Sequence, residues 1–159
     1  MTNNETNFEA VKKAFNGIRV TKGQYTGIAT CDSEGNPNVA PIGSMRVVDE
    51  NTVHVLQGYL PRTFSNLRQN PKATFSVCHK PKLFDVFKDP DQTPLGYQVT
   101  CELVDIDEAE TAVAAEYLQI VRRVPFLFRR SFIKFCEQNL KRLLKFKIVE
   151  VRPVGAPEM

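Results

Sequence analysis

Alternating apolar and polar side chains mark several strands along this chain. Residues 72–77 read Lys-Ala-Thr-Phe-Ser-Val, and residues 97–103 and 143–153 follow the same two-residue period. This period places one face of each strand against a core. Residues 23–48 and 52–57 are rich in β-branched and small residues, which favours further strands there.

Turns and helices separate these strands. The polar cluster 32–36 contains Gly35, which can adopt positive φ, so it predicts a hairpin, and a second turn is expected at 49–51. Helical spacing of apolar residues predicts an amphipathic helix over 7–18. A helical pattern also runs from 107 to about 139, with an interruption near Pro125.

The predicted order is a helix, three strands, a short helix, two strands, a long helical insert and a last strand. Helices do not alternate regularly with strands and most connections are short, which favours an antiparallel sheet. Six such strands could close into a small barrel without exposed edges. We therefore predict an α+β, mainly β fold, with one domain over 1–159 and the helical insert at about 107–139.

Composition narrows the class of protein. The 159 residues are 42% hydrophobic and 25% charged, as in ordinary globular proteins. No apolar run approaches the ~20 residues that cross a bilayer, and the polar start lacks the zones of a secretory signal, so we expect a soluble, cytoplasmic protein without membrane contact. The four cysteines, Cys31, Cys78, Cys101 and Cys136, and the two histidines, His54 and His79, show no metal-binding spacing, so we expect no metal site. The cysteines are predicted to be free, mostly buried thiols.

Charge is unevenly distributed, although the net charge is only +3. Residues 122–147 are strongly basic, whereas 102–116 are acidic. The two segments could pair with each other or face solvent. A net charge this small, without an RNA-recognition aromatic signature, argues against nucleic acid as a partner.

The stretch GYLPRTFSNLRQNP, residues 58–71, carries the clearest chemistry. We expect Thr63 to cap a short helix that Pro71 ends, and the start of a helix presents free N–H groups and a positive dipole end. Arg62 beside it adds planar donors that match phosphate oxygens. The segment thus suits a phosphate monoester; the alternative is an ordinary capped helix with a solvated arginine.

Residues 25–80 resemble the FMN-binding split-barrel family, which includes pyridoxamine 5′-phosphate oxidase. The resemblance rests on an ordered set of short elements, no one of which is specific: Gly35-Asn36-Pro37, Pro41-Ile42-Gly43, Arg62-Thr63, Asn66-Leu67 and Asn70-Pro71. It implies a six-stranded antiparallel split β-barrel with peripheral helices. It also implies a homodimer with two flavin sites at the subunit interface.

The resemblance further implies where the cofactor would bind. Arg62 and Thr63 would hold the FMN phosphate, with Asn66 one helical turn further along. The isoalloxazine ring would be lined by the second and third strands, at Ala40, Pro41, Ile42, Gly43, Leu56, Gln57 and Gly58. Small residues there would let backbone amides approach a flat ring. For Pro41 and Gly43 the alternative is a β-bulge or an edge strand.

The implied function is a flavin-dependent oxidoreductase acting on a small molecule, because the flavin itself carries the redox chemistry. Alternatives are a noncatalytic FMN carrier or electron-transfer module, and a reductase that uses a deazaflavin or FAD. Vitamin B6 oxidases of the family carry basic residues that would fall near Ala40 and Met45, so true pyridoxamine 5′-phosphate oxidase activity is not expected. No catalytic residue stands out, and His54 and His79 are more typical of structural histidines.

Residues 121–142 combine phenylalanines with paired arginines. The simplest interpretation is a helix that packs its phenylalanines on the barrel or on a partner subunit. In a second interpretation the aromatic face covers the flavin while Arg129 and Arg130 attract an anionic substrate or redox partner. A third is a helix on a membrane surface.

Overall fold

Two helices and seven strands make up the part of the chain that the computed structural model describes, residues 8–18, 24–56, 58, 60–78, 95–108, 130, 134 and 142–154. The elements are α1 (Phe8–Asn16), β1 (Thr26–Cys31), β2 (Pro37–Ile42), β3 (Met45–Asp49), β4 (Thr52–Leu56), α2 (Pro61–Gln69), β5 (Lys72–Cys78), β6 (Gly96–Glu108) and β7 (Arg142–Val154). The strands form one antiparallel sheet in the order β2-β1-β5-β6-β7-β4-β3.

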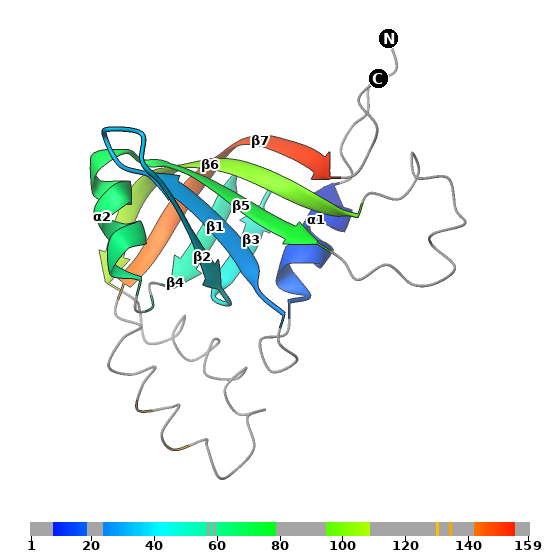
Figure 1. Ribbon diagram of the computed structural model, residues 1–159. Coiled ribbons are helices and arrows are strands. Elements are labelled where there is room, and N and C mark those ends of the chain that lie inside the picture. The colour runs from blue at the N-terminus through cyan, green and yellow to red at the C-terminus, as the bar shows by residue number, and fades with distance from the viewer. Residues whose placement is uncertain are drawn as a thin grey trace.

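The sheet curls into a split barrel because its two edge strands are consecutive in the chain. β2 and β3 lie at opposite ends of the strand order, yet only Gly43 and Ser44 connect them. Three Cα steps of 3.8 Å span at most about 11 Å, so the two edges must come close together. No ladder joins these two described strands, and the barrel is split there (Figure 1). The predicted antiparallel split barrel is confirmed.

The prediction of six strands was wrong by one. The continuous β-rich run 23–48 contains three strands, because the chain breaks at Gly43 and Ser44. β2 pairs with β1, whereas β3 pairs with β4, so the two strands on either side of the break belong to different hairpins. The hairpin turn at Gly35 is confirmed, and its φ of 87° is one that glycine adopts without strain.

Apolar side chains from every strand meet inside the barrel. Phe75 of β5 and Phe146 of β7 are fully buried, and their rings pack edge to face with centroids 5.2 Å apart. Val11 and Phe15 of α1 enter the same core, as the helical spacing predicted. Figure 1 shows α1 and α2 at opposite ends of the barrel, with α2 beside β1 and β2.

β6 extends past residue 107, where the helical insert was predicted to begin. β6 continues through Asp107 to Glu108, where Glu108 lies opposite Arg142 of β7. Lys145 of β7 forms ion pairs with Asp105 and Asp107, so the acidic and basic segments do pair across strands at this point. These cross-strand contacts outweigh the low β-propensity of aspartate and glutamate.

The rest of the predicted insert lies outside the described residues, apart from the helical residues Arg130 and Lys134. Among the described helices, none is long and apolar enough to cross a membrane.

Both edges of the sheet are protected against further strand pairing. On β3, the Asn16 side chain donates from Nδ2 to the Val47 carbonyl at 2.9 Å, and the Val47 N–H donates to Asn16 Oδ1 at 2.8 Å. On β2, Pro37 and Pro41 have no N–H to offer an incoming strand. Neither edge is therefore an open template for another chain.

The described cysteines are all free, as predicted, but they are not mostly buried. Cys78 is exposed at the end of β5 and Cys31 is half-buried, whereas Cys101 is fully buried. Burial raises the pKa of the Cys101 thiol to about 12, which keeps it protonated and unreactive at neutral pH. Cys136 lies outside the described residues.

Candidate functional site

The start of α2 differs from the prediction in one respect. Leu60 is the N-cap, Pro61 occupies the first helical position, and the first intrahelical bond runs from the Phe64 N–H to the Leu60 carbonyl at 3.0 Å. Thr63 is therefore inside the first turn, and its prediction as the cap was wrong. Proline's fixed φ starts a helix without a capping side chain. The N–H groups of Arg62 and Thr63 precede the first intrahelical donor.

Arg62 is the exposed cation at this helix start. It lies seven residues before Gln69 and shares its side of α2. Gln69 Oε1 accepts a 3.0 Å hydrogen bond from Ser33 Oγ, so this side of α2 faces the β1–β2 turn. No ion pair of Arg62 is found within the described part of the chain. Its guanidinium is thus available to an anion.

Asp32 is an acid that Arg62 influences electrostatically, but other donors already bind its carboxylate. The Asn36 side chain and backbone N–H donate to it, and so does the Glu34 N–H. The pKa of Asp32 is lowered chiefly by the Asn36 side-chain hydrogen bond, and Arg62 contributes only a smaller coulombic effect. Asp32 therefore stabilises its own turn and does not pair with Arg62.

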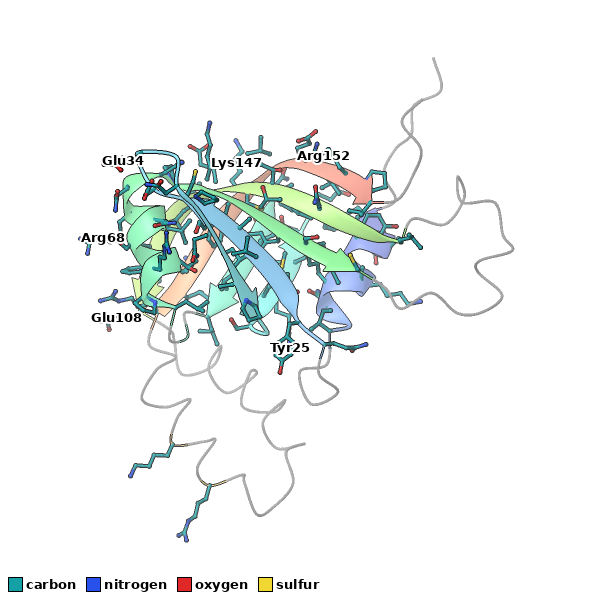
Figure 2. The ribbon with its side chains drawn as sticks, viewed as in Figure 1. Tyr25, Glu34, Arg68, Glu108, Lys147 and Arg152 are labelled. Carbon is teal, nitrogen blue, oxygen red and sulfur yellow. The ribbon has the colours of Figure 1, made fainter. Side chains whose placement is uncertain are left out.

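The opposite side of α2 carries a second basic cluster that the sequence did not reveal. The guanidinium carbons of Arg68 and Arg142 lie 5.9 and 5.0 Å from the ring centroid of Phe64. Figure 2 shows Arg68 projecting outward from α2. Arg142 comes from the start of β7, so only the fold brings it here. These cations interact with a ring, whereas Arg62 has no such partner among the described residues.

Thr63 and Asn66 face inward from α2 and are buried. There they meet Thr30 of β1 and Asn38 of β2 in a hydrogen-bonded polar cluster. Neither Thr30 nor Asn38 was predicted as a site residue from the sequence. Thr30 could have been found, because it is a polar residue at an inward position of a strand whose other inward residues include Ile28.

The segments predicted to line a flavin ring do come together. The Ser44 hydroxyl donates a 2.6 Å hydrogen bond to the Leu56 carbonyl, which joins the β2–β3 connection to the end of β4. Gly58 is half-buried, and a Cβ added there would meet nothing within 4 Å, so its backbone is open to approach. Gln57 lies outside the described residues.

The four predicted ring-lining residues at the end of β2 differ in exposure. Ala40 and Ile42 point their side chains into the core, so only their backbone could contact a ring. Pro41 is exposed on the edge strand, and Gly43 is half-buried just after it. The edge-strand alternative for Pro41 is therefore what the structure shows, and it is compatible with backbone contact at the same edge.

His54 lies in a row of charged side chains across β3, β4 and β7. It is paired with Arg46 on one side and with Lys145 on the other. Burial and then Lys145 lower the pKa of His54, while Asp49 and Asp107 act in the opposite direction. His79 lies outside the described residues. Within the described ranges, no group of three potential metal ligands occurs.

The fold and this helix start define a class of split-barrel proteins, and comparison with known proteins gives the family. The sequence profile of the pyridoxamine 5′-phosphate oxidase family matches residues 18–155. The chain therefore belongs to that family, as the resemblance of residues 25–80 predicted. No curated protein sequence matches the chain.

Solved structures share the fold at low sequence identity. An FMN-binding protein from Syntrophomonas wolfei subsp. wolfei is 22% identical, with a TM-score of 0.64 over 94% of this chain and 87% of the other. The HupZ protein of Group A Streptococcus is 17% identical, with a TM-score of 0.58 over 93% and 94%. A protein named F420 reductase is 14% identical, with a TM-score of 0.56 over 91% and 94%.

Proposed function

We propose that this protein binds FMN, with the phosphate at the start of α2 and the isoalloxazine ring against the β2–β3 connection and the end of β4. The observation that carries the proposal is Arg62, an exposed guanidinium without an ion pair in the described part of the chain, next to two N–H groups that precede the first intrahelical bond. A phosphate monoester supplies the charge and the acceptor oxygens that these donors lack.

The second part of the site fits a flat ring. Ser44 holds the β2–β3 connection against Leu56, so two stretches of backbone with small or edge residues lie side by side. Backbone N–H and carbonyl groups there could bond the polar edge of an isoalloxazine, while Pro41 and Gly43 leave room beside it. The structural neighbour described as FMN-binding supports this choice of cofactor.

We propose that the bound flavin serves an oxidoreductase that acts on a small molecule. A flavin supplies hydride and electron transfer when bound, and this chain's residues would bind and orient it. Pyridoxamine 5′-phosphate oxidation is not the proposed reaction, because Ala40 and Met45 stand where cations are expected and both side chains are buried in the core. A deazaflavin is the second candidate cofactor, and the similar solved structure named F420 reductase supports it.

We also propose a homodimer. The segments assigned to the ring lie at the split of the barrel and include the outward-facing Pro41 of β2. A single chain leaves Pro41 and the neighbouring outward-facing Val39 exposed. A second copy placed against this surface would shield the ring from water. Because Pro37 and Pro41 block strand addition, the contact would involve side-chain faces and not a continuous sheet.

The test of FMN binding is a fluorescence titration of the purified protein with FMN, riboflavin, FAD and a deazaflavin. We expect FMN to bind more tightly than riboflavin, because only FMN carries the phosphate. A protein that purifies without colour and leaves FMN fluorescence unchanged would overturn the proposal. Tighter binding of the deazaflavin than of FMN would assign the second candidate cofactor instead.

A further inference from the structure

Four polar side chains lie beneath the first turn of α2. Thr30, Thr63 and Asn66 are 6%, 4% and 4% exposed, and Asn38 of β2 is half-buried beside them. Asn38 Nδ2 donates to Thr63 Oγ1 at 3.0 Å and to Thr30 Oγ1 at 3.5 Å. Asn66 Nδ2 donates to Thr30 Oγ1 at 3.3 Å. The cluster joins β1, β2 and α2 at the helix start that carries Arg62.

The direction of the hydrogen bond between Asn38 and Thr63 has a chemical consequence. An amide nitrogen only donates, so the Thr63 oxygen is the acceptor and its own hydrogen must go elsewhere. No acceptor for this hydrogen is found among the described residues. Thr63 also contributes one of the backbone N–H groups that precede the first intrahelical bond. A buried hydroxyl hydrogen without an acceptor is unfavourable unless a ligand supplies one.

We propose that Asn38 is a positioning residue for the cofactor phosphate, and this inference rests on the proposed FMN site. By donating to Thr63 Oγ1, Asn38 commits the Thr63 hydroxyl to donate its hydrogen to a phosphate oxygen. An ionised phosphate only accepts hydrogen bonds, so a hydroxyl held as a donor matches it. Asn38 itself does not contact the phosphate; it acts through Thr63.

Thr30 provides the matched control. It receives donors from the same Asn38 amide and from Asn66, so its removal disturbs the same cluster. It has no hydrogen bond to Thr63, however, and it does not set the direction of the Thr63 hydroxyl. Thr30→Val should therefore lower thermal stability without changing the preference for FMN over riboflavin by more than about twofold.

The test is a double-mutant cycle in full-length protein, with Asn38→Ala, Thr63→Val and the double variant. The readout is the ratio of riboflavin Kd to FMN Kd, because a general packing defect weakens both ligands. Thr63→Val should reduce this ratio by about tenfold, the value of one charge-assisted hydrogen bond. Asn38→Ala should reduce it by several-fold in the wild-type background, and by less than about twofold in the Thr63→Val background.

Asn38→Asp keeps the size of the side chain and covers the case in which the alanine variant does not fold. An aspartate accepts where the amide donated, so the Thr63 hydroxyl would turn toward it, and the ratio should fall further than in Asn38→Ala. Additive effects in the cycle, or equal losses for FMN and riboflavin in both Asn38 variants, would overturn the role of Asn38 while leaving FMN binding intact. Failure of the wild-type protein to bind FMN would overturn both proposals.

Discussion

The Ser44 hydroxyl donates a hydrogen bond to the Leu56 carbonyl at 2.6 Å, one position beyond the Met45–Val55 pair of the β3–β4 ladder. Ser44 belongs to the two-residue connection between β2 and β3, and Leu56 is the last residue of β4, just before the loop that leads into α2. This bond places the β2–β3 connection next to the approach to α2. The proposed ring-binding and phosphate-binding segments are thereby held in one region.

Arg62→Ala should weaken FMN far more than riboflavin. Losing a charge-assisted contact to phosphate should cost on the order of 1.5–3 kcal/mol of binding free energy, or roughly ten- to hundredfold in affinity. Arg68→Ala is the control, because Arg68 is an exposed arginine on the same helix but lies over Phe64 on the other side. Fluorescence titrations of both variants check this. Equal losses in the two variants would show that general positive charge, and not Arg62, attracts the cofactor.

The FMN-loaded protein should have twice the monomer mass in light scattering, since the proposed ring site at the barrel split is completed by a second copy. The monomer mass from composition is 18.0 kDa. Val39→Asp, on the outward face of β2, should shift the protein toward monomer, because the side chain is 74% exposed in the single chain and a charge there would be buried in the dimer. A flavin-loaded monomer at micromolar concentration would contradict an interface site.

Asn16→Ala should destabilise the fold and increase aggregation. It removes both hydrogen bonds from Asn16 to the Val47 backbone, which leaves the edge of β3 open to pairing. We expect a loss of about 1–3 kcal/mol in the free energy of unfolding. Glu9→Ala, at an exposed position of the same helix, is the control. Urea denaturation and light scattering on heating measure the two effects, and equal behaviour of the two variants would refute the edge-protecting role.

His54 should make the fold less stable in mild acid. Burial and Lys145 lower the pKa of His54 in the folded state, so the unfolded chain binds the proton more readily. This contribution to stability is present above the ordinary histidine pKa of 6.5 and is lost as pH falls through it toward the lower folded value. His54→Gln should therefore show a smaller fall in Tm between pH 7.5 and 5.5 than the wild type. An identical fall in both proteins would exclude His54 as a source.

The sequence by itself determined most of the described elements, and it determined the family. Two-residue alternation in residues 72–77 and 97–103, helical spacing over 7–18 and a glycine in the 32–36 turn are local properties, so the strands, the first helix and the hairpin followed from them. The ordered motifs from Gly35 to Pro71 indicated the split barrel because they reflect its order of strands and short helix. Arg62 as an anion ligand also remains a prediction from this local pattern.

Only the tertiary structure decided which residues meet across the barrel. The break at Gly43 and Ser44 could not be predicted from the sequence. A continuous β-rich run has the same residue pattern whether it forms one strand or two strands that pair with different neighbours. Likewise, β6 extends to Glu108 because Lys145, far along the chain, pairs with its aspartates. Thr63 faces inward because Pro61 starts the helix two residues earlier. There the side-chain amide of Asn38 on β2 donates a hydrogen bond to the Thr63 hydroxyl oxygen. Long-range contacts of this kind are set by the closure of the sheet, which no local pattern encodes.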